Sequence, residues 1–169
     1  MEYNASVIQS KYKMVPRTLI FIERDEEILL IHKNKRDSYG FSKLNGIGGH
    51  IEKGEDPHEA AKREIYEESG LTIENLSLVA IIIIDIGINP GILLFVFKAE
   101  YPGGKLKESD EGNLVWMKRS SIRNLNNLVK DIPFLLELAD SYKEGSPLTF
   151  VKYLYDEKGK LRIVTQLPV

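Results

Sequence analysis

The sequence predicts an α+β fold in which helices pack as layers on a β-sheet. Short β-rich runs bounded by turn residues predict the sheet, and two segments with helical signals lie among them. Of the 169 residues, 43% are hydrophobic and 28% are charged, as in globular domains. This length suits one domain, so we expect residues 1–169 to form a single domain with its own core.

The first part of the sheet is predicted from two β-rich runs, residues 18–22 and 28–32. Charged turn residues separate the runs, so we expect the two strands to pair as a hairpin. Residues 33–43 are polar and contain Gly40, which predicts a loop.

A central helix has clear boundary signals. Asp56 is a suitable N-cap, Pro57 suits the first helical position, and Glu59 completes an arrangement like a capping box. Gly70 suits the residue that ends the last turn. The apolar stripe that would pack on a sheet consists of Ala60, Ala61 and Ile65.

The second part of the sheet is predicted from two apolar runs, residues 79–86 and 92–99, which a turn at 89–91 separates. Because both runs are continuously apolar, we expect them to be buried on both faces. The remaining predicted elements are a strand at 114–117, a helix at 133–142, and a hairpin of 148–155 with 161–164.

Three carboxylates are predicted to share one face of the central helix. Glu64, Glu67 and Glu68 stand at positions i, i+3 and i+4. On an exposed helix such like charges repel by about 0.2–0.5 kcal/mol per pair, and a cation between them would reverse the sign. Oxygen ligands of this kind suit Mg²⁺ or Mn²⁺. The alternative interpretation is a solvated acidic helix.

Composition excludes several classes of function. The chain has no cysteine, so it has no disulfide, zinc–thiolate site or thiol nucleophile. Its net charge of -2 gives no general attraction for nucleic acid or for a membrane. The longest apolar run, residues 78–84, is too short to cross a bilayer, and the first residues lack a signal peptide pattern. We expect a cytoplasmic protein, as a monomer or homodimer, that binds neither nucleic acid nor membrane.

The segment 49–71 resembles the Nudix box, G-x5-E-x7-R-E-U-x-E-E-x-G-U, where U is aliphatic. The fixed positions are Gly49, Glu55, Arg63, Glu64, Ile65, Glu67, Glu68, Gly70 and Leu71. The resemblance to the Nudix hydrolase family implies an αβα sandwich around a mixed β-sheet. It also implies Mg²⁺- or Mn²⁺-dependent hydrolysis of a nucleoside diphosphate linked to another group.

The resemblance also implies roles for individual residues of the box. Glu67 and Glu68 are expected to be metal ligands, and Glu64 is expected to be a ligand, the general base, or both. Arg63 would orient the glutamates by pairing with Glu55, although an ordinary surface pair with Glu67 is the alternative. The backbone carbonyl of Gly48 is a further expected ligand.

Two segments outside the box resemble the MutT-related oxidised-purine nucleoside triphosphatases, especially the animal type. They are Asn-Gly-Ile-Gly-Gly at 45–49, and Glu-Ser-Asp-Glu at 108–111 followed by Trp116. This likeness implies that Glu111 faces the metal, that Asn45 contacts the base, and that 8-oxo-dGTP is cleaved to the monophosphate and pyrophosphate. The alternatives are an acidic turn for Glu111, an ordinary Asn-Gly turn for Asn45 and a core role for Trp116.

The chain departs from the animal type where the base would bind. Leu44 replaces a tryptophan, and residues 127–134 contain no tryptophan and a single aspartate, Asp131. Asp131 would read a purine edge or would merely precede a helix. Lys35 is a candidate phosphate contact and Tyr39 a candidate stacking platform, with a solvated loop and core packing as the respective alternatives.

Further candidates are more ordinary. Lys33 and Arg36 would either meet phosphates or belong to a solvated loop. The three histidines show no metal-site spacing and are expected to be surface or packing residues. Two other functions stay open: a Nudix hydrolase for a nucleotide sugar or dinucleoside polyphosphate, and a nucleotide-sensing Nudix domain without turnover. Sensing domains usually lack box glutamates, which are all present here.

Overall fold

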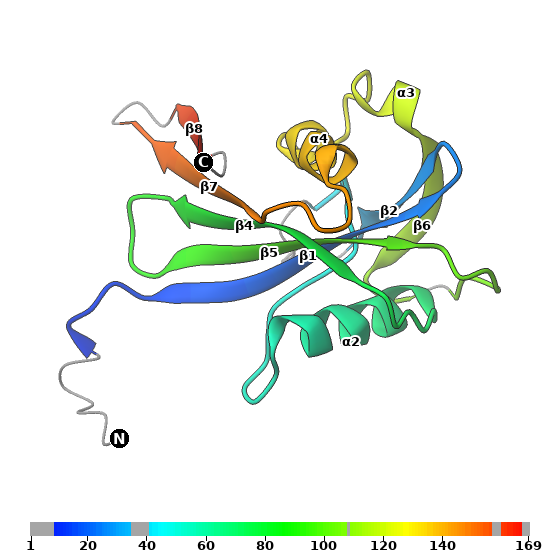
Figure 1. Cartoon of the computed structure of the whole chain (residues 1–169), viewed down its shortest axis with the longest axis horizontal. Coiled ribbons are helices and arrows are strands. Elements are labelled where there is room, and N and C mark those ends of the chain that lie inside the picture. The colour runs from blue at the N-terminus through cyan, green and yellow to red at the C-terminus, as the bar shows by residue number, and fades with distance from the viewer. Residues whose placement is uncertain (1–8, 35–40, 108, 157–159, 167–169) are drawn as a thin grey trace.

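The computed structural model describes residues 9–34, 41–107, 109–156 and 160–166. A mixed β-sheet forms the middle layer, with helix α2 (Pro57–Ser69) on one face and helix α4 (Ile132–Ser141) on the other (Figure 1). The predicted αβα sandwich around a mixed sheet is therefore confirmed. No helix in these described ranges is long and apolar enough to span a membrane.

The sheet has eight strands, and a short helix, α3 (Arg119–Ile122), follows one of them. The strands are β1 (Met14–Arg24), β2 (Glu27–Lys33), β3 (Leu44–Asn45), β4 (Ser77–Asp85), β5 (Gly91–Glu100), β6 (Gly112–Lys118), β7 (Thr149–Tyr155) and β8 (Leu161–Gln166). Every predicted strand and helix is present. β3 and α3 were not predicted, because both are too short to show a periodic pattern.

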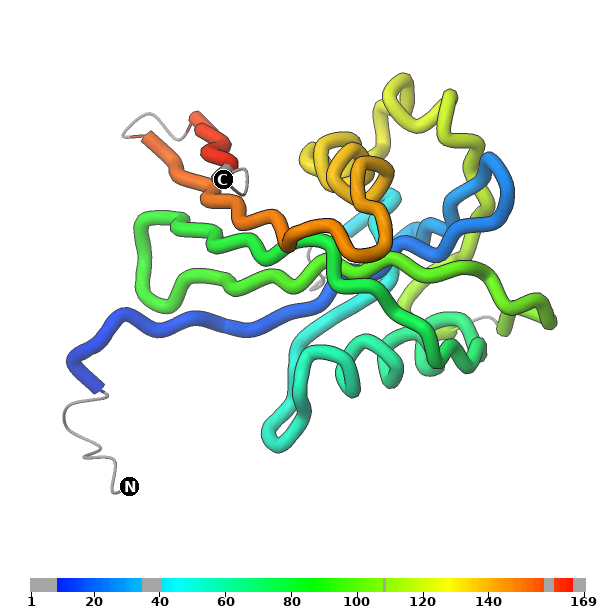
Figure 2. The backbone as a smooth tube through the Cα atoms, in the orientation of Figure 1, coloured from blue at the N-terminus to red at the C-terminus, as the bar shows by residue number. Residues whose placement is uncertain are grey.

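The strand order is β3-β2-β1-β5-β4-β7-β8, with β6 pairing on β2. β1 runs parallel to β5 and β4 parallel to β7, while the other pairs are antiparallel. The predicted hairpins β1–β2 and β7–β8 are confirmed. The chain trace in Figure 2 shows β1 alongside β5, although most of the site lies between them in the sequence.

The alternation of side chains along β1 builds both halves of the core. Leu19 and Phe21 belong to the cluster under α4, whereas Ile20 and Ile22 belong to the cluster that packs on α2. Trp116 of β6 is partly buried against the α2 cluster, so its predicted core role is confirmed.

The expectation that β4 and β5 are buried on both faces is wrong at one end of the strands. Ile83 is 39% exposed, and Ile84 and Ile92 are only partly buried. These ends extend beyond both α2 and α4, so neither of these two helices covers them (Figure 1). One face of this uncovered end contributes to the pocket described below.

Candidate active site

Helix α2 begins and ends where its sequence signals place the boundaries. The Asp56 side chain accepts hydrogen bonds from the backbone N–H groups of His58 (2.7 Å) and Glu59 (2.9 Å). The Glu59 carboxylate accepts one from the Asp56 N–H in return, at 3.0 Å. Gly70 ends the helix with a left-handed φ of 72°. These caps fix the rotation of α2, and hence the direction of its carboxylates.

Two glycines let the chain pass tightly between β1 and α2. A Cβ atom at Gly48, where φ is 139°, would lie 2.3 Å from the backbone oxygen of Thr18. A Cβ atom at Gly49 would lie 2.4 Å from Oε1 of Glu64. Backbone hydrogen bonds between Ile20 and Ile47 hold this segment on β1. Because glycine has no Cβ, the backbone at these two positions can run this close to β1 and α2.

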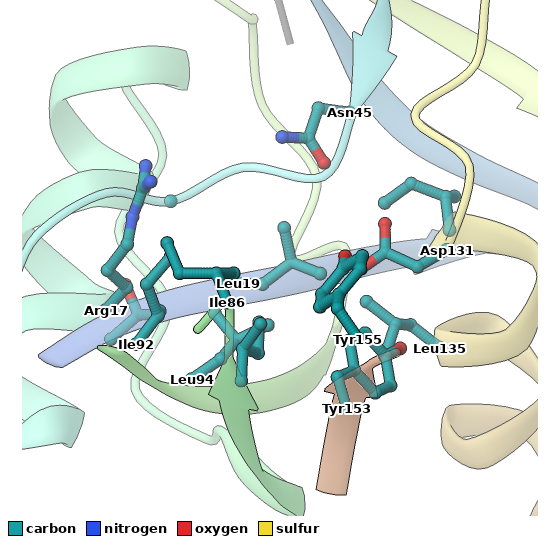
Figure 3. Close-up of a pocket in the computed structure, with 14 residues that line it drawn as sticks. Arg17, Leu19, Asn45, Ile86, Ile92, Leu94, Asp131, Leu135, Tyr153 and Tyr155 are labelled. Carbon is teal, nitrogen blue, oxygen red and sulfur yellow. The ribbon is translucent and has the colours of Figure 1, made fainter. Parts of the chain in front are cut away.

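A pocket opens beside this segment (Figure 3). Its apolar wall comes from β1, β4, β5 and α4 and includes Leu19, Ile84, Ile92, Leu94 and Leu135. Arg17, Asn45 and Asp131 are its charged or amide side chains, and Gly48 also lines it. Because Gly48 also contacts α2, the pocket adjoins the carboxylate face of that helix.

Backbone pairing brings Asn45 and Asp131 to one pocket. The Leu44 N–H donates to the Asn127 carbonyl at 2.7 Å, and the Val129 N–H donates to the Leu44 carbonyl at 3.0 Å. This pairing ties the segment before α4 to β3. Asn45 is buried in β3 and accepts a bond from the Gly46 N–H, rather than forming an exposed turn. Asp131 is the N-cap residue of α4, but its side chain accepts no capping hydrogen bond from that helix. Burial raises the pKa of Asp131.

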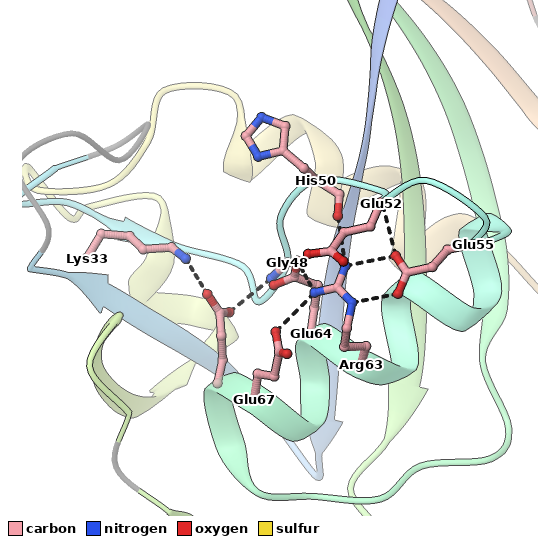
Figure 4. Close-up of polar contacts among 9 residues, drawn as sticks. Lys33, Gly48, His50, Glu52, Glu55, Arg63, Glu64 and Glu67 are labelled. Atoms are coloured by element: carbon pink, nitrogen blue, oxygen red, sulfur yellow. Dashed lines mark hydrogen bonds and ion pairs between the residues drawn. The ribbon is translucent and has the colours of Figure 1, made fainter.

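Arg63 is the centre of the polar network on α2 (Figure 4). Its guanidinium donates to both carboxylate oxygens of Glu55, at 2.6 and 3.0 Å. It also donates to Glu64 at 2.9 Å, to Glu67 at 3.0 Å and to the His50 carbonyl at 2.9 Å. The expected pair with Glu55 and the alternative pair with Glu67 are both present. The Arg63 hydrogen bond lowers the pKa of Glu55 to about 2, and the Glu52 N–H contributes to this shift.

Among the residues that the structure describes, Glu68 is the most deeply buried carboxylate, with a side chain 1% exposed. One oxygen accepts a hydrogen bond from the Lys33 ammonium, and the other accepts one from the Gly48 N–H at 3.0 Å. Burial raises the pKa of Glu68, the charge of Lys33 opposes that rise, and repulsion from Glu111 adds to it. Glu111 therefore lies close enough to Glu68 for the two charges to interact.

The predicted loop position of Lys33 is wrong. Lys33 is the last residue of β2, and its side chain is 7% exposed. The sequence pattern does indicate a strand position for Lys33, because Leu29, Ile31 and Lys33 are every second residue and so lie on one face of a strand. The pattern was missed because a lysine after an apolar run reads as the start of a loop.

Glu64 and Glu67 lie on the same side of the helix but differ in exposure. The Glu64 side chain is 12% exposed, and the Glu67 side chain is 55% exposed. Burial raises the pKa of Glu64, whereas the hydrogen bond from Arg63 lowers it. The charges of Glu68 and Glu67 both raise the Glu64 pKa, so the three carboxylates act on one another electrostatically.

The carboxylates of this network suit a hard divalent cation, because such cations prefer oxygen atoms. The negative charges of the carboxylates also outnumber the two cations paired with them, Lys33 and Arg63. In the described ranges no three acidic or histidine side chains are already arranged as a metal cluster. Arg63 and Lys33 engage the carboxylates instead. An ion that bound several of these glutamates would therefore have to compete with these ion pairs.

Lys35, Arg36 and Tyr39 lie outside the described residues. The histidines have ordinary surroundings: His32 contacts Asn34, His58 packs edge-on against Phe97, and His50 is exposed. Sequence reasoning missed Arg17 and the apolar pocket wall, because β1, β4, β5 and α4 meet there only after folding.

Known proteins are similar to this chain in sequence and in fold. The NUDIX domain model matches residues 13–137. The oxidized purine nucleoside triphosphate hydrolase of Mus musculus is 31% identical over 106 residues, which are 62% of this chain and 67% of that protein. The ADP-ribose pyrophosphatase of Methanocaldococcus jannaschii is 36% identical over 110 residues, 64% of this chain and 61% of that protein.

The fold agrees with these sequence matches. The crystal structure of a MutT protein from Bacillus halodurans superposes with a TM-score of 0.72 at 25% identity, covering 90% of this chain and 97% of that one. The matches to the two curated relatives span only about two thirds of their lengths. Since the domain model covers most of the chain and the box folds as described, the protein belongs to the Nudix family.

Proposed function

We propose that this protein is a metal-dependent pyrophosphohydrolase that cleaves a purine nucleoside triphosphate to the monophosphate and pyrophosphate. An oxidised purine such as 8-oxo-dGTP is the substrate we favour. The family and its hydrolase relatives support the reaction class, and the name of the mouse relative supports the substrate.

The observation that carries the proposal is that the pocket and the carboxylates of α2 meet at Gly48. Gly48 lines the pocket and also donates to Glu68 of the box. A nucleotide with its base in the pocket would therefore extend its phosphates toward the carboxylates. The apolar wall suits a flat base, and a few polar groups at the edge suit its recognition.

Asn45 and Asp131 are the proposed base-reading residues. An amide offers both a donor and an acceptor to a base edge. Because burial raises the pKa of Asp131, its carboxyl takes up a proton more readily and then offers a donor as well. Guanine-type bases present an acceptor at O6 beside donors at N1 and N2, whereas cytosine presents a donor at N4 beside acceptors at N3 and O2, so two such residues would distinguish the two bases.

The remaining roles belong to the box. A bound Mg²⁺ or Mn²⁺ would polarise the phosphates and make water a better nucleophile. Glu64, Glu67, Glu68, Glu111 and the Gly48 carbonyl are the proposed ligands. Arg63 and Glu55 would keep the glutamates oriented, and Glu64, whose pKa burial raises, would accept a proton from water. We also propose that residues 1–169 form a single domain and that the protein is cytoplasmic and is a monomer or a homodimer.

ADP-ribose is the second candidate substrate. The archaeal relative that is named for this activity is 36% identical to this chain. Residues Arg17 and Asp131 would then meet a second sugar or the adenine, and the same carboxylates would bind the diphosphate.

The test is a panel of 8-oxo-dGTP, dGTP, dCTP and ADP-ribose with Mg²⁺, with products separated by chromatography. We expect pyrophosphate and 8-oxo-dGMP to form with the highest kcat/KM. Preferential formation of AMP from ADP-ribose would support the second candidate. Saturable binding with no product from any nucleotide would instead support a sensing domain.

A further inference from the structure

The ion pair between Lys33 and Glu68 is the feature of the site that the roles above do not use. Both side chains are almost fully buried, at 7% and 1% exposed. Such a pair is costly to bury and costly to break on one side only, because the remaining charge stays in a poorly solvated place. Its position on a box glutamate calls for a reason beyond stability.

Both oxygens of Glu68 are already engaged. Oε1 accepts from the Lys33 ammonium, and Oε2 accepts from the Gly48 N–H. The Gly48 donor is backbone that the close approach to Thr18 holds in place. A divalent cation bound to Glu68 would be repelled by the Lys33 ammonium on the same carboxylate, so the two cations compete for Glu68.

The backbone of Lys33 is anchored by hydrogen bonds, whereas its long side chain has several rotatable bonds. The Lys33 N–H donates to the Lys43 carbonyl at 3.1 Å, and the Lys33 carbonyl accepts from the Ser42 N–H at 2.9 Å. The side chain itself is a flexible four-carbon chain ending in a compact charge. Displacement of the ammonium from Glu68 thus needs a change of side-chain rotamer and no refolding of β2.

We propose that Lys33 is a positioning residue that holds Glu68 as an internal counter-cation, and that a divalent ion must displace it to bind. The proposal rests on the proposed function in one respect, that Glu68 is a metal ligand. Two consequences follow from thermodynamic linkage. The ion pair lowers the affinity for metal, and metal binding moves the Lys33 ammonium out of its buried position.

The first experiment compares Lys33→Met with the native chain by calorimetric titration of Mn²⁺ at pH 8. Removing the competitor should tighten Mn²⁺ binding by about tenfold, a typical coupling between linked sites. The same variant should have a lower Tm in chelator, and Mn²⁺ should raise its Tm more than it raises the native Tm. Lys33→Arg, which keeps the charge, should bind Mn²⁺ no more tightly than the native chain does.

The matched control is Lys62→Met. Lys62 pairs with Glu74, a more exposed ion pair that involves none of the box carboxylates. This variant should bind Mn²⁺ with native affinity and show the native change in Tm. Native or weaker Mn²⁺ affinity in Lys33→Met would overturn the proposal. It would mean that Lys33 supports the fold and does not compete with Mn²⁺ for Glu68.

The second experiment uses the native chain and so does not depend on how well a variant folds. Acetic anhydride labelling followed by peptide mass spectrometry measures the reactivity of each lysine. Lys33 labelling should rise several-fold when Mn²⁺ is added, while Lys62 labelling stays constant. Equal Lys33 labelling with and without Mn²⁺ would refute displacement. A protein that passes these tests yet releases no pyrophosphate from any nucleotide would refute the proposed function and leave the role of Lys33 intact.

Discussion

At the scale of single residues, the site is a balance between crowded carboxylates and two cations. Arg63 donates hydrogen bonds to three glutamates and a backbone carbonyl, and Lys33 donates one to Glu68. Neither cation neutralises the site alone. The sequence could predict the acidic face of α2, since i, i+3 and i+4 spacing is local. It could not predict the partner of Glu68, since β2 and α2 meet only in the folded chain.

Glu68→Gln is expected to lower kcat by about 10²–10³, in line with the loss of one preorganised electrostatic group. The amide keeps the shape of the carboxylate but removes the charge that faces Lys33 and that would bind the proposed metal. Steady-state kinetics with 8-oxo-dGTP and Mg²⁺ measures the loss. Glu74→Gln, on an exposed glutamate outside the site, is the control and should retain native kcat. Near-native turnover in Glu68→Gln would remove Glu68 from the ligand set.

Asp131→Asn is expected to stabilise the protein at neutral pH and to have less effect in acid. Burial raises the pKa of Asp131 above its unfolded value, so folding favours the protonated carboxyl. The stabilising contribution of Asp131 is fully present below its pKa in the unfolded chain, about 3.9. This contribution is lost as pH rises through the pKa of Asp131 in the folded chain. Urea unfolding of both proteins between pH 4 and 7 measures the difference. A difference that does not change with pH would contradict this explanation.

At the scale of elements, the site depends on how closely Gly48 and Gly49 approach β1 and α2. The helix α2 was predictable from its own capping residues, whereas β3 and the pairing of Leu44 with residues 127–129 were not. These contacts join segments far apart in the chain, and no local pattern encodes them. Yet they decide that Asn45 and Asp131 line one pocket.

Ala substitutions at Gly48 and Gly49 are expected to have different effects. An added Cβ at Gly48 would meet the backbone of Thr18, which cannot give way, and φ there disfavours any side chain. At Gly49 the Cβ would meet the movable end of Glu64. Gly48→Ala should therefore lower Tm strongly, whereas Gly49→Ala should keep most of the Tm and lose activity. Thermal unfolding and initial rates distinguish the two, and equal losses of Tm would contradict the assignment.

At the scale of the whole molecule, the sheet joins two sites that the sequence keeps apart. Its α2 face carries the carboxylates, its α4 face carries the pocket, and Gly48 belongs to both. The αβα layers could be expected from the family resemblance. The strand order could not be read from the chain, because β1 pairs with β5 and β2 with β6 across long stretches of sequence. The uncovered ends of β4 and β5 likewise follow from where the helices stop.

The most direct measurement of the central claim is kcat/KM for 8-oxo-dGTP and for dCTP, in the native chain and in Asn45→Ala. A site whose buried polar groups pair with a purine edge discriminates against a base that lacks the matching groups. The native chain should prefer 8-oxo-dGTP. Asn45→Ala should lose activity mainly on 8-oxo-dGTP, so that the ratio of kcat/KM for 8-oxo-dGTP to kcat/KM for dCTP falls. An unchanged ratio, or equal losses on both nucleotides, would contradict base recognition by this pocket.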